Sequence, residues 1–400
     1  MSQNPADPQE PLLPRRPQLR RLRPQRLVAP LACTALLVGC SAAGADHPAA
    51  AARGPSSTTA GSAAATDPTS RTASPTAPSG TSPGTSPTTA ATVTVAFGGD
   101  VHFEGADGAR LAANPRTAIG PVSALLRRAD VAMVNLETAV TTRGTPQAKE
   151  FVFRAPPTAF TALRSAGVDV VTQANNHGMD YGLVGLHDSI AAAHSARFPV
   201  VGNGMDADAA FAPWTTTVRG TRISVIGATQ VLDANLAAAW TAGVGKPGLA
   251  SAKDVPRLLA AVRAARAHAD VVVVYVHWGT EMRSCPTTAQ TSLARAVTNA
   301  GADVLVGSHA HVLLGAGRMG SSYVDYGLGN FVFYAHSGPT VSSGVLTLTL
   351  KGRRVQSARW SPARISDGIP VPLRGSAADS ARDSWVRLRS CTGLAAVPGS

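Results

Sequence analysis

The sequence predicts an α/β fold that contains both parallel and antiparallel strands, and three observations support this prediction. Strand-like apolar runs and amphipathic helical segments alternate through the middle of the chain, which is the order of an α/β domain. Residues 271–274 are four consecutive valines, and a strand that is apolar on both faces is typically covered by helices. After residue 342 apolar and polar residues alternate, which predicts antiparallel strands.

Strands are predicted at short apolar runs, and helices where apolar residues recur three and four positions apart. The predicted strands are residues 93–97, 131–134, 168–172, 223–228, 271–276, 304–306 and 323–326, followed by antiparallel strands at 345–350 and 354–360. The predicted helices are residues 117–128, 158–166, 183–196, 254–267 and 287–300. The folded domain is therefore expected to span residues 93–365, and residues 366–400 are expected to form a C-terminal tail.

The first forty residues have the pattern of an export signal. Six arginines precede residue 27, and the apolar run at residues 27–39 is short for a membrane span and is interrupted by Pro30. The run leads into Leu-Val-Gly-Cys at residues 37–40, which resembles a bacterial lipobox. The resemblance implies cleavage before Cys40 and a lipid on its sulfur. The mature protein is therefore expected outside the cytoplasm, anchored by lipid to the outer face of the cytoplasmic membrane.

Residues 41–92 are predicted to be a disordered linker. They are rich in Ala, Ser, Thr, Pro and Gly and contain almost no large apolar side chains. Such a segment cannot offset the entropy lost on ordering. A flexible coil of this length averages about 40 Å from end to end, so the linker is expected to tether the folded domain away from the membrane.

The net charge of +12 is concentrated at the two ends of the chain. Residues 1–40 contain six basic and two acidic side chains, and residues 351–400 contain nine basic and three acidic ones. Residues 93–350 keep a charge of only +2, because the linker is neutral. The domain is therefore not expected to bind nucleic acid, whereas its basic C-terminal region suits an anionic wall polymer or membrane.

Two of the four cysteines are predicted to form a disulfide. Cys33 lies in the predicted signal and Cys40 is the predicted lipidation site, which leaves Cys285 and Cys391. An even pair outside the cytoplasm predicts a bridge that ties the C-terminal tail to the domain. The alternative is a pair of free buried thiols.

Side chains suited to binding metal ions follow five of the predicted strands. His309 and His311 come directly after the apolar run 304–306, and an irregular turn there would let both rings converge. The residues at the ends of the other four strands are Asp100, His102, Asn135, Glu137, Asn175, Asn176, His177, His277 and Glu281. The carboxyl ends of parallel strands meet at one edge of a sheet, so these side chains are expected to lie together.

The order of these motifs resembles the calcineurin-like metallophosphoesterase pattern. That pattern runs Asp-x-His, an acid, Asn-His, a single His and then Gly-x-His-x-His. The motifs at residues 135–137, 175–182, 277–279 and 326–331 are similar to those of the CapA family of capsule-synthesis proteins. The match runs from about residue 93 to residue 333. The resemblance implies a metallophosphoesterase-like layered α/β sandwich with mixed sheets, and a role in producing and attaching poly-γ-glutamate.

The resemblance also implies a site for two divalent ions, Mn, Fe or Zn. The expected ligands are Asp100, His102 and His311 for one ion and Asn176, His277 and His309 for the other. Glu137 is expected to bridge them, because two close cations need a shared anionic oxygen. Asn-Leu-Glu stands here in place of the Gly-Asp of the wider pattern, so Asn135 is a rival ligand.

Two further residues are expected to take part in catalysis. His177 resembles the histidine that meets the transition state in such sites, and it is expected to protonate a leaving oxygen or nitrogen. Asp180, three residues later, is expected to orient the His177 ring. Asn175, Glu281 and Asn330 stay open between ligands, supporting residues and purely structural ones.

Three functions compete on the sequence. The first is a metal-dependent hydrolase or transferase acting on an anionic phosphoester or a γ-glutamyl amide, with Arg154 or Arg283 as an anion clamp. The second is a noncatalytic, metal-binding accessory of a membrane polymer synthase or export complex, which the expected lipid anchor favours. The third is a wall-binding adhesin, which only the basic tail supports. The chain has no ATP-binding loop, so amide synthesis would need a partner ligase.

Overall fold

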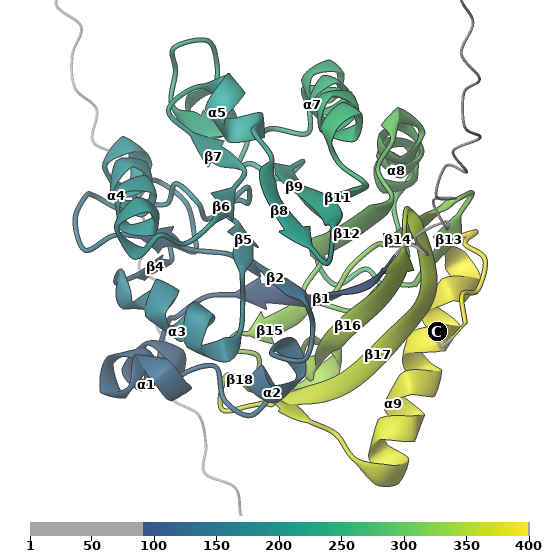
Figure 1. Ribbon diagram of the computed structural model, residues 1–400. Helices are drawn as coiled ribbons and strands as arrows, with labels where there is room; N and C mark the ends of the chain where they lie inside the picture. Colours follow the sequence, from purple (N-terminus) through teal and green to yellow (C-terminus); the bar gives the residue numbers. More distant parts are fainter. Residues whose placement is uncertain (1–90, 399–400) are drawn as a thin grey trace, which may run out of the picture. The chain divides into compact units, whose positions relative to one another are not determined.

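The computed structural model describes residues 91–398, which form four layers in the order helices, sheet, sheet, helices (Figure 1). Two sheets face each other in the middle, and helices cover the outer face of each. The predicted α/β sandwich with mixed sheets is confirmed. The predicted signal, the lipidation site Cys40 and all but the last two residues of the predicted linker lie outside the described residues.

The larger sheet has eight strands within the described residues. They are β1 (Thr92–Val101), β2 (Val131–Leu136), β5 (Val170–Thr172), β6 (Val200–Val201), β15 (Asn330–Val332), β16 (Ser342–Lys351), β17 (Arg354–Ser366) and β18 (Ile369–Pro372). Their order is β18-β17-β16-β1-β2-β5-β6, and β15 pairs with β1. The β1, β2, β5 and β6 strands run parallel, whereas β16, β17 and β18 pair in antiparallel fashion.

The second sheet has six strands in the described part of the chain. They are β8 (Trp214–Val218), β9 (Thr221–Thr229), β11 (Val271–Trp278), β12 (Val304–His309), β13 (Ala316–Met319) and β14 (Ser322–Asp325). Four parallel strands, β14-β12-β11-β9, lie between the antiparallel edge strands β13 and β8. Two short pairs stand apart from both sheets, β3 (Ala139–Val140) with β4 (Arg154–Ala155) and β7 (Asn203–Gly204) with β10 (Gly248–Leu249).

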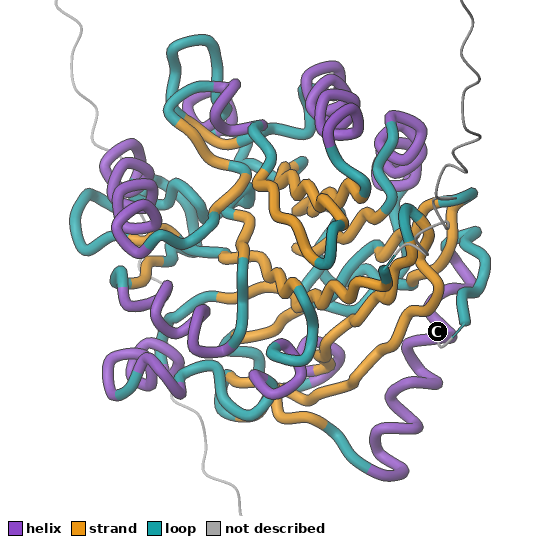
Figure 2. The backbone as a smooth tube through the Cα atoms, viewed as in Figure 1, coloured by secondary structure: helices purple, strands orange, loops and turns teal. Residues whose placement is uncertain are grey.

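The helices cover the outer faces of the two sheets (Figure 2). The larger sheet packs against α1 (Ala106–Ala113), α2 (Ser123–Leu126) and α3 (Thr158–Ala166), with α4 (Gly182–Ala196) beside α3. The second sheet packs against α5 (Ala207–Phe211), α7 (Val255–His268) and α8 (Thr288–Ala300). The short helix α6 (Ala237–Trp240) belongs to a separate small apolar cluster. No helix in residues 91–398 is both long and apolar enough to cross a bilayer.

The core between the sheets is apolar and continuous. Val95 and Leu348 of the larger sheet pack with Val273 and Val306 of the second sheet, and all four are fully buried. The Tyr275 hydroxyl of the second sheet also donates to the carbonyl oxygen of Gly98 in the larger sheet, at 3.0 Å. The buried layer holds the ends of the central strands at fixed positions, which is what a site built from both sheets requires.

The predicted helix at residues 117–128 is wrong in extent. The structure has a 3-10 turn at Pro115–Thr117 and then only the single turn of α2. Gly120 adopts φ +78°, in the left-handed region, and Pro121 follows it. A proline has no backbone N–H and constrains the residue before it, so a helix cannot run through this pair.

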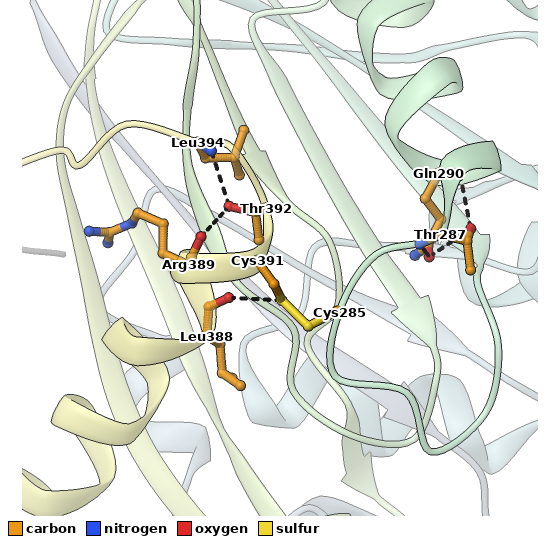
Figure 3. The surroundings of a disulfide bond; sticks show 8 residues. All are labelled: Cys285, Thr287, Gln290, Leu388, Arg389, Cys391, Thr392 and Leu394. Carbon is orange, nitrogen blue, oxygen red and sulfur yellow. Dashed lines mark hydrogen bonds between the residues drawn. A yellow bond between two sulfur atoms is a disulfide. The ribbon is translucent and has the colours of Figure 1, made fainter.

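The segment after residue 365 is part of the folded body. It completes β17, adds β18 and forms α9 (Gly375–Arg387), whose Trp385 stacks on Trp360 of β17 with ring centroids 5.3 Å apart. Cys391, just beyond α9, forms a disulfide with Cys285 in the loop before α8 (Figure 3). The disulfide therefore fastens a packed C-terminal element, where the sequence had predicted a tail.

Removing this disulfide should destabilise the protein. The bridge joins residues 106 apart in the sequence, so its loss frees a long loop in the unfolded state. The double variant Cys285→Ser/Cys391→Ser is expected to lose about 4 kcal/mol of unfolding free energy in urea titrations. A loss below about 1 kcal/mol would show that the bridge does not constrain the unfolded chain in this way.

Candidate metal centre

The candidate site lies where the carboxyl ends of strands from the two sheets meet. In the larger sheet Asp100, in β1, is in register with Asn135 of β2 and with Asn330 of β15. In the second sheet His277 and His309 lie at the ends of the neighbouring strands β11 and β12. The sheets are joined here by the backbone nitrogen of His309, which donates to Asp100 Oδ2 at 3.1 Å. Asn135 Nδ2 also lies 3.1 Å from His277 Nδ1.

The turn after β12 has an unusual backbone. His309 has φ +97° and His311 has φ +56°, both in the left-handed region that side-chain-bearing residues rarely adopt. The ring centroids of the two histidines lie 5.9 Å apart. The structure therefore brings both rings to one place through an irregular turn, and such strain is typical of functional sites.

Carboxylates and imidazoles form two groups that share Glu137. The ligand atoms in each group lie within 4.8 Å of one another, and the groups are Glu137, His277 and His309, and Asp100, Glu137 and His311. Glu137 Oε1 lies 3.3 Å from His277 Nε2. A carboxylate that belongs to two ligand groups could serve as a ligand to both of two neighbouring cations.

The donor chemistry fits divalent cations. Both carboxylate oxygens of Glu137 and Nδ1 of His309 are buried and have no hydrogen-bond partner among residues 91–398. Burial, reinforced by nearby Asp100, raises the pKa of Glu137 well above its usual value. Burial lowers the pKa of His277 to about 3 and that of His309 well below its usual value, so both rings are neutral. A ligand set of neutral imidazoles and carboxylate oxygens that contains no thiolate suits Mn, Fe or Zn.

Buried amides hold the acidic ligands in place. Asn135 Nδ2 donates to Asp100 Oδ1 at 2.8 Å, and Asn135 Oδ1 accepts from Asn175 Nδ2 at 2.9 Å. Asn330 Oδ1 lies 2.8 Å from His311 Nδ1. Asn135, Asn175 and Asn330 are engaged with their neighbours and lie where they could support candidate ligands. Of the two rivals, Glu137 suits a ligand role better than Asn135 because its oxygens accept no hydrogen bond from residues 91–398.

The motif at residues 175–182 places an amide and a histidine at the centre. Asn176 Oδ1 lies 2.7 Å from His277 Nε2, so the amide oxygen joins the ligand atoms. His177 Nδ1 lies 2.6 Å from Asp180 Oδ2, and the ring stacks on Phe153 with centroids 4.0 Å apart. Burial lowers the pKa of His177 well below its usual value and raises the pKa of Asp180 to about 7. Asp180 is therefore in contact with a neutral imidazole, in a position from which it could orient the ring.

His102 differs from the expectation. Its Nδ1 accepts the Glu104 N–H at 3.1 Å, and its Nε2 lies 3.4 Å from the backbone nitrogen of Tyr334. The ring is fully buried and packs on Phe333, with centroids 4.1 Å apart, and on Phe153, at 4.8 Å. His102 belongs to neither ligand group in the described residues, because aromatic packing and backbone contacts enclose its ring.

The sequence analysis missed a buried lysine beside the centre. Lys149 Nζ lies 3.0 Å from Asp180 Oδ1 and 3.0 Å from Asp233 Oδ2, and it also donates to the carbonyl oxygen of Asn176. Its side chain is only 4% exposed and lies over the Trp240 ring. No spacing rule ties residue 149 to the motif at 175–182, so only the tertiary structure reveals the contact.

A cleft of about 610 Å³ opens onto this centre. Its lining combines polar residues of the site with aromatic and apolar side chains, including Lys149, Asn176, His177, Glu281, Met282, His311, Phe333 and Tyr334. Neither Arg154 nor Arg283 lines the cleft. The Arg154 guanidinium lies over the Tyr181 ring at 4.8 Å, and Lys149 is the basic side chain beside His177.

Replacing the buried lysine should weaken the fold around His177. Lys149→Met leaves Asp180 and Asp233 without their cation, and breaking a buried ion pair costs about 3 kcal/mol. Urea unfolding should show this loss for Lys149→Met and almost none for Lys253→Met, whose side chain is exposed. Equal stabilities of the two variants would contradict this role of Lys149.

The fold and the site define the chain as an α/β sandwich protein with a carboxylate and imidazole centre suited to metal ions. Residues 94–335, more than half of the chain, match the family described as Bacterial capsule synthesis protein PGA_cap. The chain belongs to this family of capsule synthesis proteins. The resemblance to the CapA family seen in the sequence is confirmed.

Two relatives in the genus Bacillus are similar over much of the chain. The PGA biosynthesis protein CapA of Bacillus subtilis (strain 168) is 32% identical over 256 residues, which are 63% of this chain and 66% of the relative. The capsule biosynthesis protein CapA of Bacillus anthracis is 33% identical over 214 residues, 53% of this chain and 51% of the relative. The matches thus span between half and two thirds of these relatives.

A solved structure of a phosphatase from Mycoplasma pneumoniae is similar to this chain with a TM-score of 0.43 and 13% identity. The match covers 73% of this chain and 97% of that one. A likeness of this size carries no conclusion about activity.

Proposed function

We propose that this protein is a cell-surface member of its family that acts in the synthesis or attachment of poly-γ-glutamate or another capsule or wall polymer. It would do so as a metal-dependent hydrolase or transferase on a phosphoester or a γ-glutamyl amide. The names of the two Bacillus relatives support the polymer context. The observation that carries the proposed chemistry is the buried Glu137 carboxylate, which accepts no hydrogen bond from residues 91–398 and is shared by two ligand groups.

The residues of the centre have distinct roles in this proposal. Asp100, Glu137 and His311 would hold one divalent ion, and Glu137, His277 and His309 with Asn176 the other. Bound ions of this kind supply Lewis acidity toward a phosphoryl or carbonyl oxygen and activate water.

His177 is the proton-transfer residue in this proposal. Its Nδ1 is engaged by Asp180, which leaves Nε2 to exchange a proton with the leaving oxygen or nitrogen of a substrate in the cleft. Lys149 holds the backbone of Asn176 and the carboxylate of Asp180, so the loop that carries His177 is anchored at both residues.

Metal analysis with a substrate screen tests the catalytic proposal. The purified protein should contain close to two equivalents of Mn, Fe or Zn and cleave a phosphodiester or poly-γ-glutamate. His309→Ala should lose metal and at least about 100-fold in turnover, because a ligand is removed. His187→Ala, at an exposed position on α4, is the matched control and should change neither. A wild-type protein that holds metal but turns over none of these substrates would refute the hydrolase assignment.

A noncatalytic accessory role is the second candidate. The two Bacillus relatives are named for biosynthesis, and polymer formation needs an energy source. This sequence contains no ATP-binding loop, so a partner enzyme would have to supply that energy, which favours an accessory role. The deciding result is polymer output in cells carrying His309→Ala. Normal output from a variant that has lost its metal would support the accessory role, and lost output would support the chemistry.

The site of action is proposed from the sequence signal. The lipobox at residues 37–40 supports a protein held by a lipid on Cys40 at the outer face of the cytoplasmic membrane. Cells fed a labelled fatty acid should incorporate it into the wild-type protein but not into Cys40→Ser. Equal labelling of both would show that Cys40 is not the lipidation site.

A further inference from the structure

The loop between β11 and α8 carries an acidic residue toward the metal centre. A carboxylate oxygen of Glu281 and ring nitrogens of His309 and His311 all lie within 4.8 Å of one another. His309 is 5% exposed, and its Nδ1 has no hydrogen-bond partner within residues 91–398. The group that contains Glu281 therefore includes a buried histidine with a ring nitrogen free to accept a partner, and Glu281 also lines the cleft.

The backbone of this loop touches the histidine turn directly. The Met282 N–H donates to the carbonyl oxygen of Ala310, the residue between the two histidines, at 2.9 Å. Gly279 and Met282 have positive φ angles of 101° and 61°, so the loop bends sharply on both sides of Glu281. Residues 281–285 are nevertheless exposed, and few buried side chains hold the loop in this shape.

The disulfide supplies the missing anchor. Cys285, four residues after Glu281, is bonded to Cys391 (Figure 3). Two residues later the chain enters α8 through a capping box, in which Thr287 Oγ1 accepts from Gln290 N and Gln290 Oε1 accepts from Thr287 N. The end of the loop is therefore fixed by a covalent bond and a helix start.

The partner of Cys285 is itself firmly held. Cys391 ends the 3-10 turn Leu388–Cys391 that follows α9. Beyond it Ala395 exchanges two backbone hydrogen bonds with Arg318 of β13, at 2.7 and 3.0 Å, and Leu394 packs in the core of the second sheet. The disulfide therefore connects the exposed loop to a packed element of the fold.

We propose that Glu281 is a further metal-binding carboxylate and that the Cys285–Cys391 disulfide is the element that positions it. The inference rests on the proposed metal site and adds to it a ligand delivered by a covalently anchored loop. Without the bridge, the exposed loop samples many conformations, and binding an ion has to restrict them. The disulfide restricts the loop before the ion binds, so the affinity for the ion is higher than it would be with a free loop.

Mn²⁺ titration by calorimetry of the full chain, first stripped of bound metal with a chelator, tests the inference. Glu281→Gln should weaken Mn²⁺ binding about tenfold, and Cys285→Ser/Cys391→Ser should weaken it by a similar factor. The variant that combines all three substitutions should bind no more weakly than Glu281→Gln alone, because the bridge acts through Glu281. Circular dichroism at the titration temperature confirms that each variant is folded.

The control separates loss of the bridge from general loss of stability. Leu163→Ala, buried in α3 on the other side of the larger sheet, destabilises the fold without touching the loop and should leave Mn²⁺ affinity unchanged. Unchanged affinity in Glu281→Gln or in the cysteine variant would overturn the inference while the proposed metal site stands. Fully additive losses would also overturn it. No Mn²⁺ binding by the wild-type protein would overturn the inference and the proposed site together.

Discussion

The buried carboxylate of Glu137 is the constraint around which the site is built. Neither of its oxygens has a hydrogen-bond donor among the described residues, and the side chain is fully buried. An uncompensated charge in such a place costs several kcal/mol, so the folded chain must bind a proton or a cation there. Neutral His277 and His309 on one side and the Asp100 carboxylate on the other favour a cation.

The two-sheet scaffold makes this concentration of ligands possible. The β1 strand runs so close to the 326–331 segment that a Cβ atom on Gly99 would lie 1.8 Å from the Gly329 carbonyl oxygen, so only glycine fits. The next residue, Asp100, donates its N–H to that same carbonyl at 3.0 Å. The Gly-rich stretches flanking the site thus bring Asp100 beside Asn330, and the apolar core below holds the second sheet against them.

The regular elements could be predicted because their signals are local. The α3 helix matches its predicted bounds, and the valine strand is a buried central strand as its two apolar faces required. Failures came where a local signal was overridden or absent. Gly120 and Pro121 cut short the helix predicted at 117–128. The aromatic packing that encloses the His102 ring depends on Phe153 and Phe333, which are far from it in sequence.

By itself the sequence determined which side chains stand at the strand ends, because alternating apolar strands and helices place their carboxyl ends at one edge. It also predicted a bridge between Cys285 and Cys391, which the structure contains. Only the tertiary structure decided that Glu137 is shared by two ligand groups, that Lys149 pairs with Asp180, and that the disulfide anchors the Glu281 loop. These relations are contacts between residues distant along the chain, and such contacts are set by how the two sheets and the C-terminal helix pack.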